Sequence, residues 1–142
     1  MQNQINLIYR EEEREMIPLC LDQGVGLIPW SPIARGRLAR PAGVSTARTE
    51  TDAYGRMLYA GAEAADAEVI AAVQSVADEV GRSMAQVALA WVRQKPGVVA
   101  PIVGFSRSEQ FADILSGLDL VLTADQAERV EAAYVPRSPA GH

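Results

Sequence analysis

The sequence of 142 residues is poor in the side chains on which many active sites depend. Its one cysteine, Cys20, can form neither an internal disulfide nor a cluster of cysteine metal ligands. Its single histidine is the last residue, His142, and its single lysine, Lys95, stands in the turn-like segment Q-K-P-G. A mechanism that needs lysine and histidine side by side in one cleft would have to bring the terminal His142 next to Lys95, which lies in a connecting turn. We therefore expect no complete catalytic centre of that kind.

Excess positive charge and long apolar runs are also absent. The chain has 13 basic and 18 acidic residues, a formal charge of −5, which argues against a nucleic-acid or anionic-membrane partner. No apolar run is long enough to cross a bilayer, and the opening M-Q-N-Q-I-N does not have the pattern of a signal peptide. With 49% hydrophobic and 22% charged residues, the composition is that of a globular domain. We expect a cytoplasmic protein.

Residues 25–38, V-G-L-I-P-W-S-P-I-A-R-G-R-L, combine the features of a ligand site. The apolar segment Val25–Ile28 predicts a short buried strand that ends at Pro29, because proline cannot donate to a sheet ladder. Trp30 follows, and Gly36 lies between two arginines. Ligands of parallel α/β folds bind at the carboxyl ends of strands, where aromatic rings stack on heterocycles and arginines hold phosphates. A buried tryptophan followed by a solvated basic loop is the alternative.

A second candidate site follows a strand predicted over residues 98–103. Arg107 stands between the end of that strand and a helix predicted to begin at Ser108. The helix dipole, free backbone N–H groups and a guanidinium all favour a phosphate there. An arginine on an ordinary strand-to-helix loop is the alternative.

Apolar spacing and turn residues predict the other elements. They are a strand over 2–8, a helix over 10–20 with a kink or late start because of Pro18, a long loop over 39–61 with one helical turn inside 52–59, helices over 64–80, 83–94 and 124–134, and an extended, mobile tail over 135–142. Because helices separate the strands, the strands should pair in parallel with right-handed crossovers. Three basic side chains give the long loop an option for contacting an anion: Arg40, Arg48 and Arg56.

The helix pair over 64–94 also suggests a DNA-binding helix–turn–helix. Its second helix, however, presents Met84, Val87 and Trp91 rather than polar groups that read bases. Packing in the core is therefore favoured over DNA binding.

These segments resemble the C-terminal part of the aldo-keto reductases, a family of NADP-dependent (β/α)8-barrel oxidoreductases. The opening M-Q-N-Q-I-N-L-I-Y-R-E-E-E-R-E-M is similar to the family's sixth strand and next helix, and G-V-G-L-I-P-W-S-P-I-A-R-G-R-L to its seventh strand and cofactor loop. P-I-V-G-F-S-R-S-E-Q-F is similar to its eighth strand and adenosine-phosphate loop, and L-T-A-D-Q-A-E-R-V-E-A-A-Y-V-P to the tail of one bacterial subgroup. The resemblance implies an α/β fold in one domain over 1–142. That domain would be a partial (β/α)8 TIM barrel of the sixth to eighth strands, their helices and a C-terminal helix.

The resemblance also implies an NADP site with a role for each residue. Gln2 would bond the nicotinamide carboxamide, Trp30 would stack on the nicotinamide ring, and Gln110 would lie against the adenine. The pyrophosphate would be lined, largely through backbone, by Ser31, Pro32, Ile33, Ala34, Gly36 and Leu38. The 2′-phosphate would be held by Gly104, Ser106 and Arg107. This sequence departs from the family at two positions. Family members often have an asparagine near the adenine where this chain has Ile114, and they often have a tyrosine where it has Ile5.

The family's catalytic Asp, Tyr, Lys and His are carried by its second to fourth strands and their loops, which have no counterpart here. We therefore expect the cofactor-binding portion of an NADP-dependent carbonyl reductase, from a truncated frame or a longer protein, inactive alone and with no catalytic or metal-ligating residue. A small carbonyl substrate would be met only in a full-length context. The alternative is a non-catalytic nucleotide-binding or complementing module that docks on a partner, or on its own copy, through open strand edges.

Overall fold

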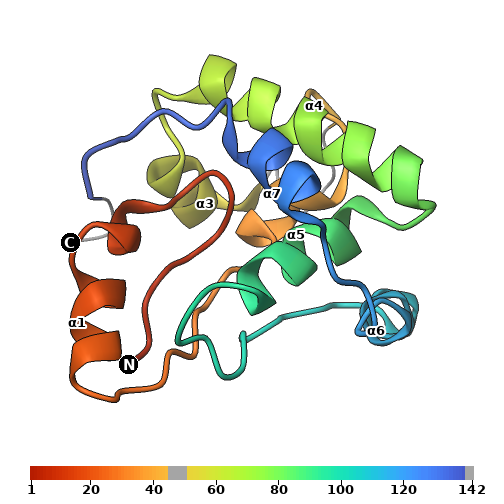
Figure 1. The fold of residues 1–142 in the computed structure, drawn as a ribbon. Helices are drawn as coiled ribbons and strands as arrows, with labels where there is room; N and C mark the ends of the chain where they lie inside the picture. Colours follow the sequence, from red (N-terminus) through yellow and green to blue (C-terminus); the bar gives the residue numbers. More distant parts are fainter. Residues whose placement is uncertain (45–50, 140–142) are drawn as a thin grey trace.

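The structure, a computed structural model, describes residues 1–44 and 51–139, and these residues are mainly helical. Figure 1 shows the long helix α4 across the top of the molecule, with α5 and α7 below it and α6 at the lower right edge. None of the helices in the described residues is long and apolar enough to cross a membrane. In chain order the elements are η1 (Glu11–Glu13), α1 (Met16–Asp22), η2 (Ala34–Ala39), α3 (Ala53–Leu58), α4 (Glu63–Val80), α5 (Met84–Arg93), α6 (Ser108–Ser116) and α7 (Ala124–Glu131).

Local capping groups place the helix ends close to where the sequence predicts them. The Ser83 Oγ accepts the N–H of Gln86 at 3.2 Å, and the Gln86 Oε1 accepts the N–H of Ser83 at 3.2 Å, at the start of α5. Thr123 and Gln126 form the same reciprocal pair at the start of α7. Gly81 ends α4 with φ 66°, a left-handed conformation that glycine adopts without strain.

Helices also form in the segment 10–20, which contains a proline, and inside the predicted long loop. The helix predicted over 10–20 starts late, at Met16, after the short turn η1, so the predicted late start is confirmed. The helical turn predicted inside the long loop is α3, whose first turn is capped by Asp52. The predicted anion contact at Arg48 and the lone His142 lie outside the described residues.

The predicted strands are present only as isolated β-bridges. Three parallel bridges join the extended segments: Gln4 with Trp30, Leu27 with Val98, and Trp30 with Ile102. The parallel direction agrees with the prediction, but residues 1–44 and 51–139 contain no continuous strand, so the partial barrel of three strands is not confirmed. Pro29 and Pro101 interrupt two of the three segments, and a proline has no N–H with which to extend a ladder.

The core lies around α5. All nine residues from Met84 to Val92 are buried, and α5 packs against α4, α6 and η2. Residues 3–9 are buried as well, although they form no strand. A helix buried along its whole length cannot enter a DNA groove, which removes the helix–turn–helix alternative for α5.

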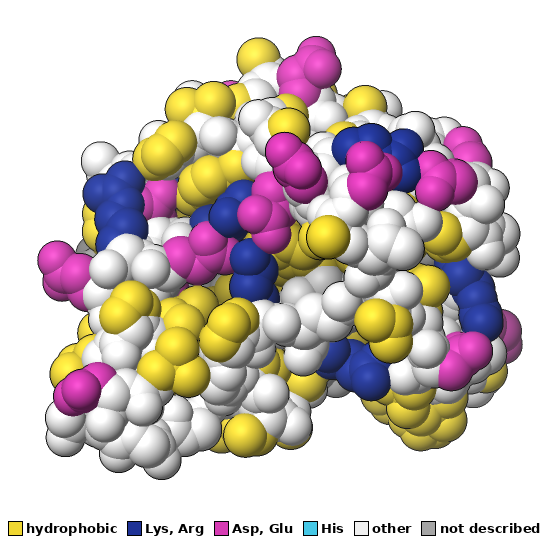
Figure 2. All heavy atoms as spheres, in the orientation of Figure 1, with side chains coloured by type: hydrophobic (Ala, Val, Ile, Leu, Met, Phe, Trp, Pro, Cys, Tyr) yellow, Lys and Arg dark blue, Asp and Glu magenta, His cyan; other side chains and the backbone are white. Residues whose placement is uncertain are grey.

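The segment Val25–Ile28, predicted to be a buried strand, is largely exposed, and so are large apolar side chains of α6. Of the segment Val25–Ile28, only Leu27 is buried. On α6 only Ile114 is buried, whereas Phe111 and Leu115 are 44% and 48% exposed. Figure 2 shows hydrophobic side chains on the visible face at the lower left, over α1, and at the lower right, over α6.

Residues 135–139 are extended, as predicted, but the prediction that they are mobile is wrong, because Arg137 anchors them to the helical body. The Arg137 N–H donates to Oε1 of Glu11 at 2.7 Å, and its guanidinium forms an ion pair with Asp66 of α4. The Arg137 side chain is 12% exposed and that of Asp66 4%, so this is a largely buried ion pair.

Candidate functional site

One cavity, of about 490 Å³, collects most of the residues singled out in the sequence. Its volume lies in the range of small-molecule sites. Eight of the twelve predicted residues line it: Trp30, Ser31, Pro32, Ile33, Gly36, Gly104, Arg107 and Gln110. Its other lining residues, not assigned to the site from sequence, are Arg35, Ala39, Arg40, Ser83, Ala85, Ile102, Asp113 and Ile114. Two distant segments, one around Trp30 and one around Arg107, therefore share one cavity. We call it the Trp30–Arg107 cavity.

Four predicted site residues do not line this cavity. Ala34 and Leu38 are fully buried in the core, so neither presents exposed surface to a ligand, and the predicted backbone contact with the pyrophosphate is not seen at these two positions. Gln2 and Ser106 are exposed. The Ser106 N–H donates to Oε1 of Gln110 at 2.9 Å, so Ser106 helps to shape the loop before α6.

The loop from Ser31 to Gly36 has an unusual backbone. Ser31, Ala34 and Arg35 have φ of 56°, 49° and 55°, and they are the only non-glycine residues with positive φ in the described part of the chain. Gly36 follows with φ 91°, and a Cβ built there would lie 2.6 Å from Nη2 of Arg40. Residues held in such conformations cluster at ligand-binding loops, where the surrounding structure must hold them in place.

Two buried amide side chains, those of Asn6 and Gln4, support this loop through hydrogen bonds. Asn6, which is fully buried, donates its Nδ2 to the Ser31 carbonyl at 3.0 Å and to the Tyr59 hydroxyl at 3.1 Å. Gln4 donates its Nε2 to the same hydroxyl at 2.9 Å. Burial raises the pKa of Tyr59, so its hydroxyl stays neutral and accepts both amides. The sequence signal for this support was a polar Asn6 inside an apolar run, and sequence reasoning missed it.

The cavity lining is positively charged, although the chain as a whole is acidic. Three arginines and one carboxylate, Arg35, Arg40, Arg107 and Asp113, give the lining a formal charge of +2. Arg35 donates Nε and Nη2 to Asp52 at 2.5 and 2.9 Å, and this hydrogen bonding raises the pKa of its guanidinium. Arg107 makes no ion pair within the described residues, so its charge is available to an anionic ligand.

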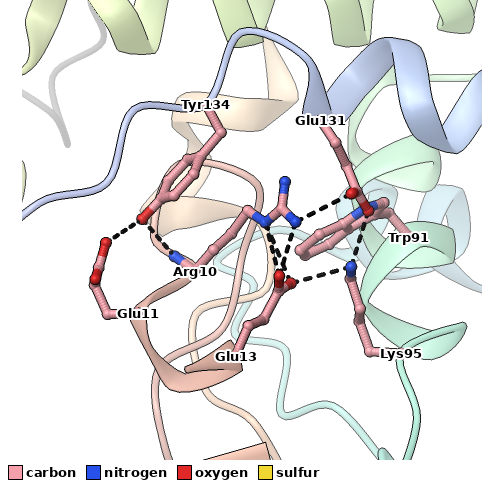
Figure 3. A network of polar contacts seen from close by, with 7 residues as sticks. All are labelled: Arg10, Glu11, Glu13, Trp91, Lys95, Glu131 and Tyr134. Atoms are coloured by element: carbon pink, nitrogen blue, oxygen red, sulfur yellow. Dashed lines mark hydrogen bonds and ion pairs between the residues drawn. The ribbon is translucent and has the colours of Figure 1, made fainter. Parts of the chain in front are cut away.

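The single lysine lies outside the cavity, in the network of Figure 3. Lys95 Nζ contacts carboxylate oxygens of Glu131 at 2.8 Å and Glu13 at 3.0 Å, and Arg10 bridges the same two carboxylates at 3.0 and 2.7 Å. The ring of Trp91 lies under both cations, and its Nε1 donates to Glu131 at 2.6 Å. Because all four charges are paired, this network ties η1, the end of α5 and α7 together and offers no free base.

No group of His, Cys, Asp and Glu in residues 1–44 and 51–139 is arranged to hold a metal ion. The Trp30–Arg107 cavity has the side chains to hold a small anionic ligand. Its lining includes the aromatic ring of Trp30 and the guanidinium of Arg107, the residue directly before the N-terminus of α6.

Comparisons with known proteins match almost the whole chain. A sequence model described as the aldo/keto reductase family matches residues 1–135. Versiconal hemiacetal acetate reductase of Aspergillus parasiticus is 48% identical over 97% of this chain and 40% of its own length. An aldo-keto reductase of Fusarium vanettenii is 41% identical, and one of Alternaria alternata is 43% identical, each over 100% of this chain and 38% of its own length.

The chain thus spans about two fifths of the length of these curated relatives. All three are fungal proteins, so they do not support the bacterial subgroup expected from the tail.

Proposed function

This chain belongs to the aldo/keto reductase family, and from that premise we propose that the Trp30–Arg107 cavity binds NADP as part of a carbonyl-reducing oxidoreductase. When bound, the nicotinamide ring donates a hydride to a carbonyl or accepts one from an alcohol. The chain's own residues would bind the dinucleotide and orient it.

The observation that carries the proposal is the meeting of two distant segments on one positively charged cavity. The chain has a net charge of −5, yet three arginines and one carboxylate line this cavity. Arg35 is paired with Asp52, whereas Arg107 makes no ion pair within the described residues. Dinucleotide phosphates need positive charge, and the cavity has Arg107 directly before the N-terminus of α6, where the helix dipole adds to it. An aromatic ring at Trp30 suits a flat heterocycle.

The residues present fit the dinucleotide in a definite order. The nicotinamide would lie at Trp30, the pyrophosphate along the loop from Ser31 to Gly36, and the 2′-phosphate at Gly104 and Arg107. The placement at Gly104 is supported by open space, since a Cβ built there would meet no atom within 4 Å. Gln110 would lie on the adenine side, and Gln2 at the carboxamide.

We also propose that these 142 residues do not form a complete reductase site by themselves. The described lining of the cavity contains no tyrosine, lysine or histidine that could protonate a carbonyl oxygen. Lys95 is held by Glu13 and Glu131 in the network of Figure 3. The alternative of a non-catalytic complementing module is not favoured by the relatives, which are named as reductases.

The decisive experiment replaces Arg107 with alanine and compares NADP with NAD, which lacks the 2′-phosphate. A hydrogen bond to a charged group contributes about 1.5–3 kcal/mol, so NADP should bind about 10- to 100-fold more weakly. NAD should change by less than about twofold. Arg129→Ala, which removes an exposed arginine of α7 outside the cavity, is the control and should alter neither affinity.

Isothermal titration calorimetry on the 142-residue chain gives both dissociation constants. Equal losses for the two nucleotides on Arg107→Ala would refute the 2′-phosphate assignment, and no binding of either by the unaltered chain would refute the proposed function. Reduction of an aldehyde by the pure chain with NADPH, abolished by Trp30→Ala, would contradict the incomplete site.

A further inference from the structure

The helix α6 forms one wall of the Trp30–Arg107 cavity, but apolar packing holds it weakly. Arg107 immediately precedes α6, and Gln110, Asp113 and Ile114 lie on it, so four lining residues depend on its position. Among the residues of α6, only Ile114 is buried. Figure 1 shows α6 at the edge of the molecule, at the end of an extended segment that leads away from α5.

A polar side chain from the buried helix α5 holds α6 in place. Gln86 is 4% exposed, and its Nε2 donates to the Asp113 carbonyl at 2.6 Å, to Oγ of Ser116 at 2.9 Å and to Oδ1 of Asp113 at 3.1 Å. The hydroxyl of Ser83 donates to the other carboxylate oxygen of Asp113 at 2.7 Å. A buried amide is tolerated only when it is hydrogen-bonded, so this contact is a strong constraint on where α6 can lie.

The orientation of the Gln86 amide is fixed from its other side. Its Oε1 accepts the N–H of Ser83, the residue that caps the start of α5, so the Nε2 must point toward α6. Gly117, just after α6, permits the approach, because a Cβ built there would lie 2.4 Å from Cγ of Gln86 and 2.6 Å from its Cδ. No side chain fits between these two residues.

We propose that Gln86 is a positioning residue for the phosphate end of the cavity, although it does not line the cavity itself. By fixing α6 on α5, it sets the place of Arg107 relative to the loop that begins at Trp30. This inference rests on the proposed function, because the ligand that would sense the displacement is the 2′-phosphate of NADP.

The same chain offers a matched control for a purely local capping role. Gln126 occupies the corresponding place in α7, where its Oε1 accepts the Thr123 N–H at 3.0 Å and its N–H donates to the Thr123 hydroxyl at 3.2 Å. Its Nε2 also reaches another helix, at Glu79 of α4, 2.8 Å away. Gln126→Met therefore breaks the same kinds of bond as Gln86→Met without touching α6.

The test compares NADP and NAD binding to the unaltered chain, Gln86→Met and Gln126→Met by calorimetry. Gln86→Met should weaken NADP about tenfold and NAD by less than about twofold, whereas Gln126→Met should change neither. General destabilisation would weaken both nucleotides alike, so equal losses for NADP and NAD, or no loss for either, would overturn the positioning role.

Gly117→Ala provides a second variant in case Gln86→Met folds poorly. The new Cβ pushes α6 away from Gln86 while all polar atoms of the contact remain, and it should reproduce the selective loss of NADP affinity. An unchanged NADP affinity in well-folded Gly117→Ala would count against the inference.

Hydrogen exchange without ligand separates this inference from the proposed function. The amides of residues 108–116 should exchange faster in Gln86→Met than in Gln126→Met, and equal exchange would overturn the positioning role whether or not nucleotide binds. If the unaltered chain binds neither nucleotide, the proposed function fails, and the exchange rates alone decide whether Gln86 positions α6.

Discussion

Replacing Glu131 with glutamine tests whether the network of Figure 3 joins separate segments of the fold. Glu131 accepts Nε1 of Trp91 at 2.6 Å and Nζ of Lys95 at 2.8 Å on one oxygen, and Nη2 of Arg10 at 3.0 Å on the other. A glutamine has a single acceptor oxygen. Its amide N–H group must therefore face one of these donors, and the negative charge is lost.

The expected loss of stability depends on which hydrogen-bond partners Arg10, Lys95 and Trp91 keep after the substitution. Hydrogen bonds to a charged group contribute about 1.5–3 kcal/mol each, but Arg10 and Lys95 keep Glu13 as a second partner. The Glu131 side chain is 28% exposed, which reduces the Coulomb contribution. We expect the free energy of unfolding to fall by about 2 kcal/mol. Alanine should cost more, because it leaves the buried Trp91 N–H without its acceptor.

The effect should depend on pH in a definite direction. Burial raises the pKa of Glu131, but hydrogen bonds from Lys95 and Trp91 and the nearby cations outweigh it, so the pKa lies below its usual value of 4.5. A carboxylate with a lowered folded pKa contributes stability above its unfolded pKa and loses it as pH falls through the folded pKa. The difference between the unaltered chain and Glu131→Gln should be full at neutral pH and shrink below about pH 4.5.

Urea unfolding followed by tryptophan fluorescence measures this difference. The control is Glu79→Gln, because Glu79 also accepts an arginine and a glutamine, Arg129 and Gln126, but on the exposed surface. That substitution should leave the unfolding midpoint unchanged. Equal shifts in the two variants, or a Glu131 effect that is the same at neutral pH and at about pH 3.5, would refute the reasoning.

Two further predictions concern the anchored end of the chain. Burial and the hydrogen bond to Glu11 raise the pKa of Tyr134 to about 12, above its ordinary 10, so its stabilising effect should be full below pH 10 and lost as pH rises to about 12. Alkaline unfolding should show this loss, and identical profiles for Tyr134→Phe and the unaltered chain would contradict it. Arg137→Ala should lower the free energy of unfolding by about 3 kcal/mol, because it leaves Asp66 buried without its cation. Urea unfolding checks this, and a change no larger than that of Arg129→Ala would count against it.

The helices were predictable because their signals are local. Ser83 and Thr123 cap the starts of α5 and α7, and Gly81 ends α4. Each of these signals uses hydrogen bonds within one turn of the chain. Their energies therefore depend little on what packs nearby.

The strands were not predictable from the same kind of pattern. Apolar spacing predicts that a segment is suited to a sheet, but a ladder forms only when a neighbour supplies donors and acceptors in register. In the described residues each extended segment meets its neighbour at single bridges, and Pro29 and Pro101 lack the N–H groups that would extend them. The exposure of Phe111 and Leu115 has the same origin, since burial depends on partners far along the chain.

The residues that line the candidate site were predictable from the sequence, but the buried residues that hold them in place were not. Trp30 and Arg107 were singled out because a ring and a guanidinium at the ends of apolar segments have recognisable chemistry, and both line one cavity. Gln86 and Asn6 were missed because a polar residue among apolar ones does not show, in the sequence, which groups it will bond. Their importance arises from hydrogen bonds to residues tens of positions away.

The buried side chains that hold the cavity walls in place, Asn6 and Gln86, are neutral amides, and their neutrality affects the charge of the cavity. Asn6 holds the Ser31 carbonyl on the side of the strained loop, and Gln86 holds Asp113 on the side of α6. A lysine or glutamate in either buried place would add a charge near the ligand and would be costly to bury. Because an amide fixes position without adding charge, the lining keeps its formal charge of +2 in a chain whose net charge is −5. An anionic ligand would therefore be attracted to the cavity even though the rest of the molecule repels it.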